Sequence, residues 1–254
     1  MTHLSRVRSS FALQASEFSD SRHTIGSQEI LAWIVEHVRP EPEQLALDVA
    51  SGTALLASAL APRVGKVVAL DATLEMLREG RRAGHGAGLQ NVAFLQALAQ
   101  SLPFSQGTFD VVASRLALHH VPDPARMLFE MCRVAKPGGG VFLIDLVSPE
   151  DPVLGKRYND LERLRDPSHV RALPIDELMH AFLDLGRAPT LLDLRTITVD
   201  FGRWVELTQT PPAVVRQIRE TLLAEVNGGE VTGFQPSLVD GVLKFHQRWA
   251  IVRA

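Results

Sequence analysis

Between residues 45 and 147, five short apolar runs alternate with helical patterns, and this alternation limits the folds open to the chain. The runs cover residues 45–49, 66–70, 92–95, 109–113 and 141–144. Each run is largely apolar at consecutive positions, which is typical of parallel strands with helices on both faces. The alternation therefore predicts an α/β fold with a doubly wound, mostly parallel sheet.

The flanking segments extend the predicted sheet and its covering helices. Asp123 followed by Pro124 marks the start of a helix, and residues 136–139 mark its end. Ser27 is a candidate cap for an earlier helix, and residues 174–186 and 210–227 have helical patterns. Residues 191–201 and 242–252 resemble two late strands, which bring the sheet to seven strands, whereas residues 149–171 show no clear strand.

We expect these elements to form one domain over residues 1–254. An N-terminal helical cover over residues 1–43 precedes a cofactor-binding core over residues 44–147. Residues 148–187 form an insertion after the fifth strand, interpreted as a lid over the substrate. Residues 188–254 supply the late strands and a helix.

Composition excludes several classes of function. Hydrophobic residues make up 46% of the 254 residues, which excludes a disordered chain, and a net charge of −3 gives no broad basic field for a nucleic acid. Cys132 is the only cysteine, so a reducing, cytoplasmic location is expected. Residues 1–20 lack the apolar stretch of a secretory signal, and no apolar run of about 18 residues predicts a membrane span. We expect a small-molecule substrate and no nucleic-acid or membrane partner, with the late strands and residues 231–242 as a candidate homodimer surface.

The turn after the first predicted strand carries the first sign of chemistry. Residues 47–54 read LDVASGTA, and small residues there let a ligand approach backbone N–H groups closely. The second strand ends at Asp71, and an acidic residue at this position can accept hydrogen bonds from both hydroxyls of a ribose. Together these features indicate a nucleoside-containing cofactor.

Several segments in order resemble the motifs of class I S-adenosylmethionine-dependent methyltransferases. Residues 47–54 resemble the first motif, and residues 68–77 (VALDATLEML) resemble the second. Residues 102–112, 118–124 and 133–139 (RVAKPGG) complete the set, with the order found in the ubiquinone and menaquinone biosynthesis branch. The resemblance covers about residues 46–145 and implies a Rossmann-like, seven-stranded methyltransferase fold.

The resemblance also implies which residues contact S-adenosylmethionine. Gly52 would pass under the methionine part, Asp71 would bind the ribose, and Arg115 would approach the methionine carboxylate. Phe11 and Phe18 would close an aromatic lid. The full set of implied cofactor contacts is Phe11, Phe18, Asp48, Ala50, Ser51, Gly52, Asp71, Ala72, Met76, Leu98, Ala99 and Arg115.

Three positions depart from the family pattern. Ala50 and Ala54 stand where glycine is usual, and their methyl groups restrict positive φ and narrow the approach to the cofactor. Leu98 stands where the family usually has an aspartate that accepts a hydrogen bond from the adenine amino group. Loss of a charged acceptor typically costs about 1.5–3 kcal/mol, equivalent to about 10- to 100-fold weaker binding, unless apolar packing compensates.

The candidate catalytic residues are three histidines. His119, His120 or His169 could act as a general base if the acceptor must lose a proton. Alternatively, the pair His119 and His120 simply ends the loop after the fourth strand. No spacing of His, Cys, Asp and Glu residues predicts a metal site.

The candidate substrate-binding residues lie in the insertion. Arg165, His169 and Arg171 could bind an anionic acceptor or form surface salt bridges and helix caps. Tyr158 could line the pocket or pack in the interior.

The leading hypothesis is an S-adenosylmethionine-dependent methyltransferase acting on a small molecule. A second hypothesis keeps the fold but replaces methyl transfer by rearrangement, cyclisation or elimination, with the cofactor auxiliary or absent. A third is a non-catalytic partner protein. The acceptor and its reacting atom do not follow from the sequence, because one fold serves many substrates.

Overall fold

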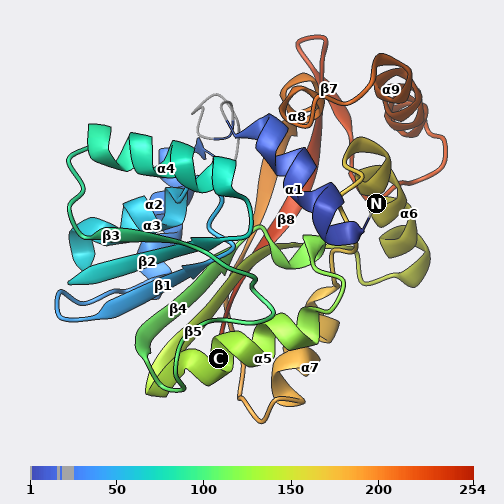
Figure 1. Cartoon of the computed structure of the whole chain (residues 1–254). Helices are drawn as coiled ribbons and strands as arrows, with labels where there is room; N and C mark the ends of the chain where they lie inside the picture. The colour runs from blue at the N-terminus through green and yellow to red at the C-terminus, as the bar shows by residue number, and fades with distance from the viewer. Residues whose placement is uncertain (1, 16–17, 19–25) are drawn as a thin grey trace.

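The computed structural model describes residues 2–15, 18 and 26–254. Within these residues a sheet of eight strands runs through the centre, in the order β3-β2-β1-β4-β5-β8-β6, with β7 paired to β8 (Figure 1). The strands are β1 (Leu45–Val49), β2 (Lys66–Asp71), β3 (Val92–Gln96), β4 (Phe109–Arg115), β5 (Ala135–Val147), β6 (Thr190–Asp200), β7 (Ser237–Val239) and β8 (Val242–Arg253). The strands β1 to β5 are parallel, and β8 is antiparallel to both β5 and β6. This order confirms the doubly wound α/β fold, and the short β7 is an eighth strand that the sequence did not predict.

Helices surround the sheet and begin at the capping residues that the sequence shows. The Asp123 carboxylate accepts the N–H of Arg126 at 2.9 Å, and Ser27 Oγ accepts the N–H of Ile30 at 3.5 Å. The α-helices are α1 (His3–Gln14), α2 (Gln28–Val38), α3 (Leu55–Leu60), α4 (Leu74–Gly86), α5 (Pro124–Val134), α6 (Pro152–Arg165), α7 (Ile175–Leu183), α8 (Phe201–Leu207) and α9 (Pro212–Val226). The short 3-10 helices η2 (Ala61–Arg63) and η3 (Leu118–His120) follow α3 and β4.

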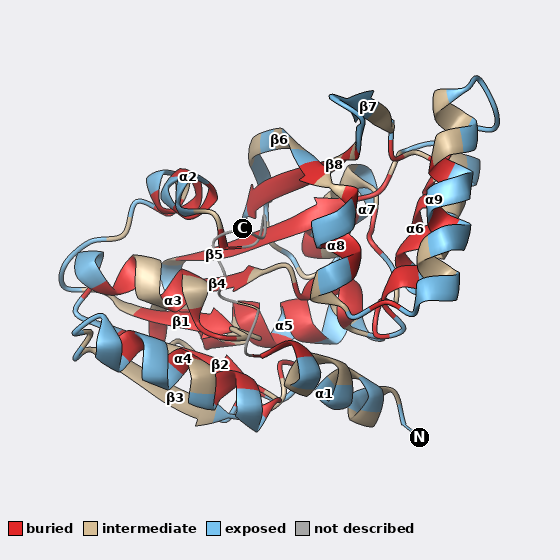
Figure 2. Cartoon of the chain, turned by 90° about the horizontal axis from the view of Figure 1, so that it is seen from above, coloured by how far each residue is buried: buried red, intermediate tan, exposed pale blue. Residues whose placement is uncertain are grey.

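Both faces of the sheet are buried, as the consecutive apolar runs predict. Along β1, Ala46 belongs to one apolar cluster, with α2 and α3, whereas Leu47 and Val49 belong to a second cluster, with α5 and α7. The same alternation continues in β5, where Phe142 and Leu143 lie in different clusters. Figure 2 shows the buried strands between helices whose outer surfaces are exposed. The fold is therefore three layers with two apolar cores.

The structure adds one element and corrects two local expectations. Residues 149–171 contain no strand, as expected, but they contain α6, which is capped by Asp151 and whose mixed charges hide its helical period. Residues 136–139 lie in β5 rather than at the end of α5, where the pairing of β4 with β5 shifts register between Phe109 and Val111. Phe201 is not the end of a strand but the first residue of α8.

Two expectations concern surfaces. In the part of the chain that is described, no helix combines the length and the apolar character needed to cross a membrane. The candidate dimer surface over residues 231–242 exposes Val231, Leu238, Val239 and Val242. The homodimer stays a prediction.

Candidate functional site

In the turn after β1, three alternate residues have backbone dihedral angles in the left-handed region. Ala50, Gly52 and Ala54 have φ values of 54°, 55° and 60°. The N–H of Ser51 donates to the carbonyl of Leu70 at 2.9 Å, and the N–H of Ala54 donates to the carbonyl of Ser51 at 2.8 Å. The turn therefore keeps the glycine-type conformation although two of its three left-handed positions carry a methyl group.

Asp71 connects this turn to the end of β2. Its Oδ2 accepts the N–H of Gly52 at 2.8 Å, and its Oδ1 accepts the N–H of Thr73 at 2.7 Å. The side chain is buried, and this burial raises the pKa of the Asp71 carboxyl. A single carboxylate thus fixes the relative positions of the two strand ends that the sequence singled out.

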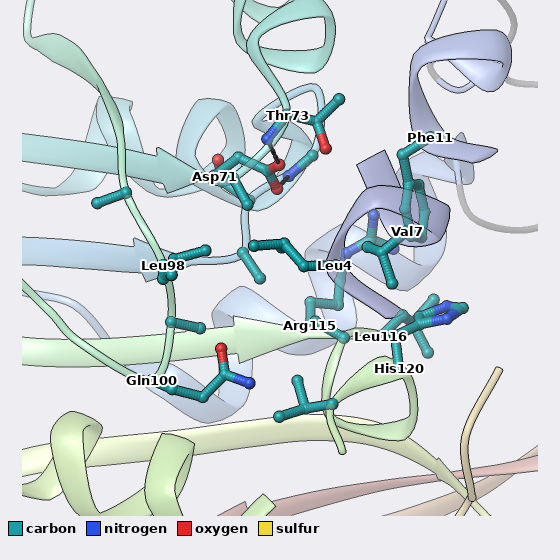
Figure 3. A pocket seen from close by; sticks show the side chains of 18 of the residues that line it. Leu4, Val7, Phe11, Asp71, Thr73, Leu98, Gln100, Arg115, Leu116 and His120 are labelled. Atoms are coloured by element: carbon teal, nitrogen blue, oxygen red, sulfur yellow. Dashed lines mark hydrogen bonds between the residues drawn. The ribbon is translucent and has the colours of Figure 1, made fainter. Parts of the chain in front are cut away.

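A cavity of about 310 Å³ opens beside Asp71, where the strand order reverses between β1 and β4. In doubly wound sheets, ligands bind at this switch point, outside the carboxyl ends of the strands. Helix α1 lies over the same side, and Figure 3 shows Leu4, Val7 and Phe11 facing the strand ends. The implied cofactor residues that line the cavity are Phe11, Phe18, Ala50, Ser51, Gly52, Asp71, Ala72, Leu98, Ala99 and Arg115.

The other two implied cofactor residues, Asp48 and Met76, are buried behind the cavity wall. Asp48 Oδ2 accepts the N–H of Ala57 at 2.9 Å, whereas Oδ1 accepts no hydrogen bond from any described residue. Burial raises the pKa of Asp48 to about 7, although the positive charge of Arg115 opposes this shift. Burial also lowers the pKa of Arg115 to about 10, so its guanidinium remains charged at neutral pH.

Sequence reasoning missed several lining residues. Gln100 points its carboxamide into the cavity beside Leu98 (Figure 3), so a polar group lies next to the position where the family aspartate is replaced. Leu4 and Val7 contribute apolar surface from α1. Gln100 lies two residues after Leu98, so the cofactor contact implied for Leu98 could have indicated it, but no pattern in α1 indicated which side faces inward.

The three candidate catalytic histidines lie together. The ring centres of His119 and His120 are 4.2 Å apart, and those of His119 and His169 are 5.4 Å apart. His119 Nδ1 donates to Asp145 Oδ1 at 2.5 Å, and His169 Nε2 donates to Asn159 Oδ1 at 2.8 Å. Across the described part of the chain, no group of three or more His, Cys, Asp or Glu side chains is arranged to hold a metal ion.

A second, smaller cavity of about 80 Å³ adjoins the first and is lined by one of the candidate substrate-binding residues of the insertion. Arg165 lines it, together with His119 and His120, whereas His169 is not among the described residues that line either cavity. Tyr158 is buried and stacked on Phe234 with ring centres 4.5 Å apart. Arg171 is exposed and pairs with Glu177 at 2.6 Å.

The strand order, with the cavity at its switch point and the Asp71 bridge beside it, defines a doubly wound, Rossmann-like fold. Residues 47–143 match the family described as a methyltransferase domain. The uncharacterised methyltransferase YcgJ of Bacillus subtilis is 32% identical over 208 residues, which cover 82% of each chain. Its crystal structure superposes with a TM-score of 0.82 at 30% identity, over 89% of this chain and 97% of that one. The chain belongs to the class I methyltransferase family.

One further sequence relative and one structural neighbour are named for different activities. A demethylmenaquinone methyltransferase of Bacillus cereus is 37% identical over 150 residues, which cover 57% of this chain and 63% of that one, in agreement with the branch expected from the motifs. The [4+2]-cyclase SpnF shares the fold at a TM-score of 0.63 and 18% identity, over 89% of this chain and 79% of that one. The fold alone therefore does not determine the reaction.

Proposed function

We propose that the protein transfers a methyl group from S-adenosylmethionine to a small-molecule acceptor. The observation that supports this proposal is the hydrogen bond from the N–H of Gly52 to Asp71 Oδ2 at 2.8 Å, because it holds a carboxylate that would bind the ribose beside an open backbone turn. The family match supports methyl transfer over the alternative of a cyclisation or rearrangement.

The residues around the large cavity fit this cofactor. The left-handed turn at Ala50 and Gly52 turns backbone atoms toward the cavity, where a methionine chain would pass. Asp71 would accept from the ribose hydroxyls, and Leu98 and Ala72 give apolar surface for an adenine. The charged guanidinium of Arg115 would attract the methionine carboxylate. When bound, the sulfonium of this cofactor supplies an activated methyl group, so the chain's main task is to orient the acceptor and exclude water.

Calorimetric titration of the full chain with S-adenosylmethionine and S-adenosylhomocysteine tests the proposal. The wild type should bind both, and Asp71→Asn should bind about 10- to 100-fold more weakly, because a charged hydrogen-bond acceptor is lost. Asp176→Asn is a matched control, since it removes an exposed carboxylate in α7, away from both cavities. Absence of binding by the wild type at millimolar ligand would refute the proposal.

A cofactor with an isotopically labelled methyl group separates transfer from the alternative reaction. Label should appear in the product of methyl transfer. A product that forms without label would identify rearrangement, cyclisation or elimination.

A further inference from the structure

The second cavity is placed to hold the molecule that reacts with a cofactor in the first. Phe11, Phe18, Leu116 and His120 line both cavities, so ligands in the two would meet at this shared wall. The deeper end of the second cavity is formed by α6, α8 and β8, which contribute Arg165, Trp204 and Trp249 among others. This placement makes the second cavity the acceptor site, an assignment that rests on the proposed function.

His119 has the geometry of a general base at this site. Its Nδ1 donates to Asp145 Oδ1 at 2.5 Å, which leaves the Nε2 lone pair available. Asp145 is itself fixed, because Oδ2 accepts the N–H of Leu118 at 2.8 Å and Oδ1 accepts the N–H of Leu146 at 2.7 Å. A buried carboxylate in this position selects the ring tautomer and stabilises the imidazolium that forms when Nε2 accepts a proton.

The neighbouring His120 is less suited to this role. Ser168 Oγ donates to Asp166 Oδ1 at 2.6 Å, so it accepts from His120 Nδ1 at 3.0 Å, and no carboxylate of the described residues forms a hydrogen bond with the ring. Burial and the adjacent His119 lower the pKa of His120 to about 3.

His169 is also less suited, although its ring lies near His119. Asn159 Oδ1 accepts the N–H of Ala172 at 2.7 Å, which fixes the amide and makes His169 Nε2 a donor to it. Burial and the neighbouring histidines hold the pKa of His169 well below its ordinary value. Of the three candidates, His119 combines a carboxylate partner with a place in the wall of the second cavity.

Two residues of the same cavity wall carry a hydrogen-bond donor without a partner in the part of the chain that the structure describes. Arg165 Nε and Trp204 Nε1 are buried and have no hydrogen-bond partner among the described residues. The Arg165 guanidinium lies 4.8 Å from the centre of the Trp204 ring, and its Nη2 is 3.2 Å from Glu162 Oε2. An unpaired buried donor costs about 1–3 kcal/mol, and a ligand oxygen that reached either donor would remove this cost. The described Asp and Arg residues that line the cavity are Arg165, Arg203, Asp166 and Asp200, so their charges balance and a neutral acceptor oxygen suffices.

We infer that the acceptor is a planar phenol or enol that carries a second, hydrogen-bond-accepting oxygen, with its hydroxyl on His119 and the other oxygen on Arg165 and Trp204. The aromatic walls at Phe11, Trp204 and Trp249 suit a planar molecule. In the reaction, the acceptor's O–H bond breaks and its proton passes to His119 Nε2. The acceptor oxygen bonds to the methyl carbon, and the carbon–sulfur bond of the donor breaks with its electron pair left on sulfur.

The experiment uses 4-nitrophenol as the probe, with the full chain saturated with S-adenosylhomocysteine. The probe has a hydroxyl and, at its other end, acceptor oxygens, and its absorbance reports ionisation. At a pH about one unit below its solution pKa, the bound probe should show the phenolate band, because its proton passes to His119. The other charged or titratable groups around this ring and in the same cavity wall are Asp145, His120, His169, Asp166, Asp200, Arg165 and Arg203, and all are unchanged in the variants compared.

Two variants separate the two parts of the inference. His119→Asn keeps a donor to Asp145, so the probe should bind within about 3-fold of the wild type, but as the neutral phenol. Trp204→Phe keeps a ring under Arg165 and should weaken 4-nitrophenol by about 3- to 10-fold while leaving phenol, which lacks the second oxygen, unaffected. His246→Asn is the control for His119→Asn, because His246 is a partly exposed residue of β8 that lines neither cavity. This variant should retain the phenolate band.

The possible failures are distinguishable. A protein that binds S-adenosylhomocysteine but shows no saturable binding of 4-nitrophenol refutes the inferred acceptor and leaves the proposed function standing. A phenolate band that persists in His119→Asn refutes the assignment of the base. Failure to bind S-adenosylhomocysteine overturns the proposed function, and the acceptor site with it.

Discussion

Asp48 provides a quantitative test of how burial affects this site. The carboxyl lies behind the cavity wall, and burial raises its pKa from 3.8 to about 7. In the unfolded chain the group ionises near its ordinary pKa, so the folded state holds a proton that the unfolded state has lost. Between about pH 5 and 7, stability should therefore fall by about 1.4 kcal/mol per pH unit as the pH rises. The total loss from this group between about pH 5 and 8 is about 3 kcal/mol.

The substitution Asp48→Asn removes this ionisation. The variant's unfolding free energy, relative to that of the wild type, should therefore rise by about 3 kcal/mol from about pH 5 to about pH 8. Urea denaturation at a series of pH values measures this difference. The buried histidines, His120 and His169, titrate in both proteins, so their contributions cancel in the comparison.

A surface carboxylate serves as the control. Asp110 accepts from the N–H of Leu45 and from Lys136, which hold its pKa below the ordinary value. A group with a lowered pKa contributes stability that is lost only at acid pH. The difference in unfolding free energy between Asp110→Asn and the wild type should therefore not change with pH above about pH 5. If the difference in unfolding free energy between Asp48→Asn and the wild type changes by less than about 1 kcal/mol from about pH 5 to about pH 8, burial does not raise the pKa of Asp48 as argued.

Two other substitutions test the positions that depart from the family pattern. Ala50→Gly should raise the unfolding free energy by up to about 1 kcal/mol. The left-handed conformation costs alanine about 1–2 kcal/mol, which exceeds the cost of the greater chain entropy of glycine in the unfolded state. A lower midpoint in thermal denaturation would contradict this. Leu98→Asp should tighten S-adenosylmethionine binding by about 10-fold in calorimetry, because it restores a charged acceptor at the cavity wall. Unchanged affinity would show that the adenine does not reach this position.

The fold was predictable where neighbouring residues alone determine the structure. The consecutive apolar residues of β1 predicted a strand buried on both faces, and Ala46 and Leu47 do face different cores. The position of Asp71 at the end of a strand was equally visible. By contrast, α6 was missed because Lys156, Asp160 and Arg163 form ion pairs along about two turns of its exposed surface, so charge rather than apolar spacing dominates the pattern.

The candidate site was predictable only in part, for a different physical reason. Three histidines were equivalent candidates in the sequence, because what distinguishes them is a partner far along the chain. His119 and Asp145 are brought together by the end of β5 beside η3. Likewise, Arg165 and Trp204 lie on different helices, and their shared cavity exists only after α6 and α8 pack against the sheet.

The wall shared by the two cavities has a thermodynamic consequence. Phe11, Phe18, Leu116 and His120 each belong to both surfaces, so whatever fixes their positions in one cavity also sets the shape of the other. Occupancies of the two cavities are therefore linked, and the factor by which one ligand changes the affinity of the other must be the same in both directions. A measurement of either affinity with the other cavity filled therefore gives the free energy of coupling between the two cavities.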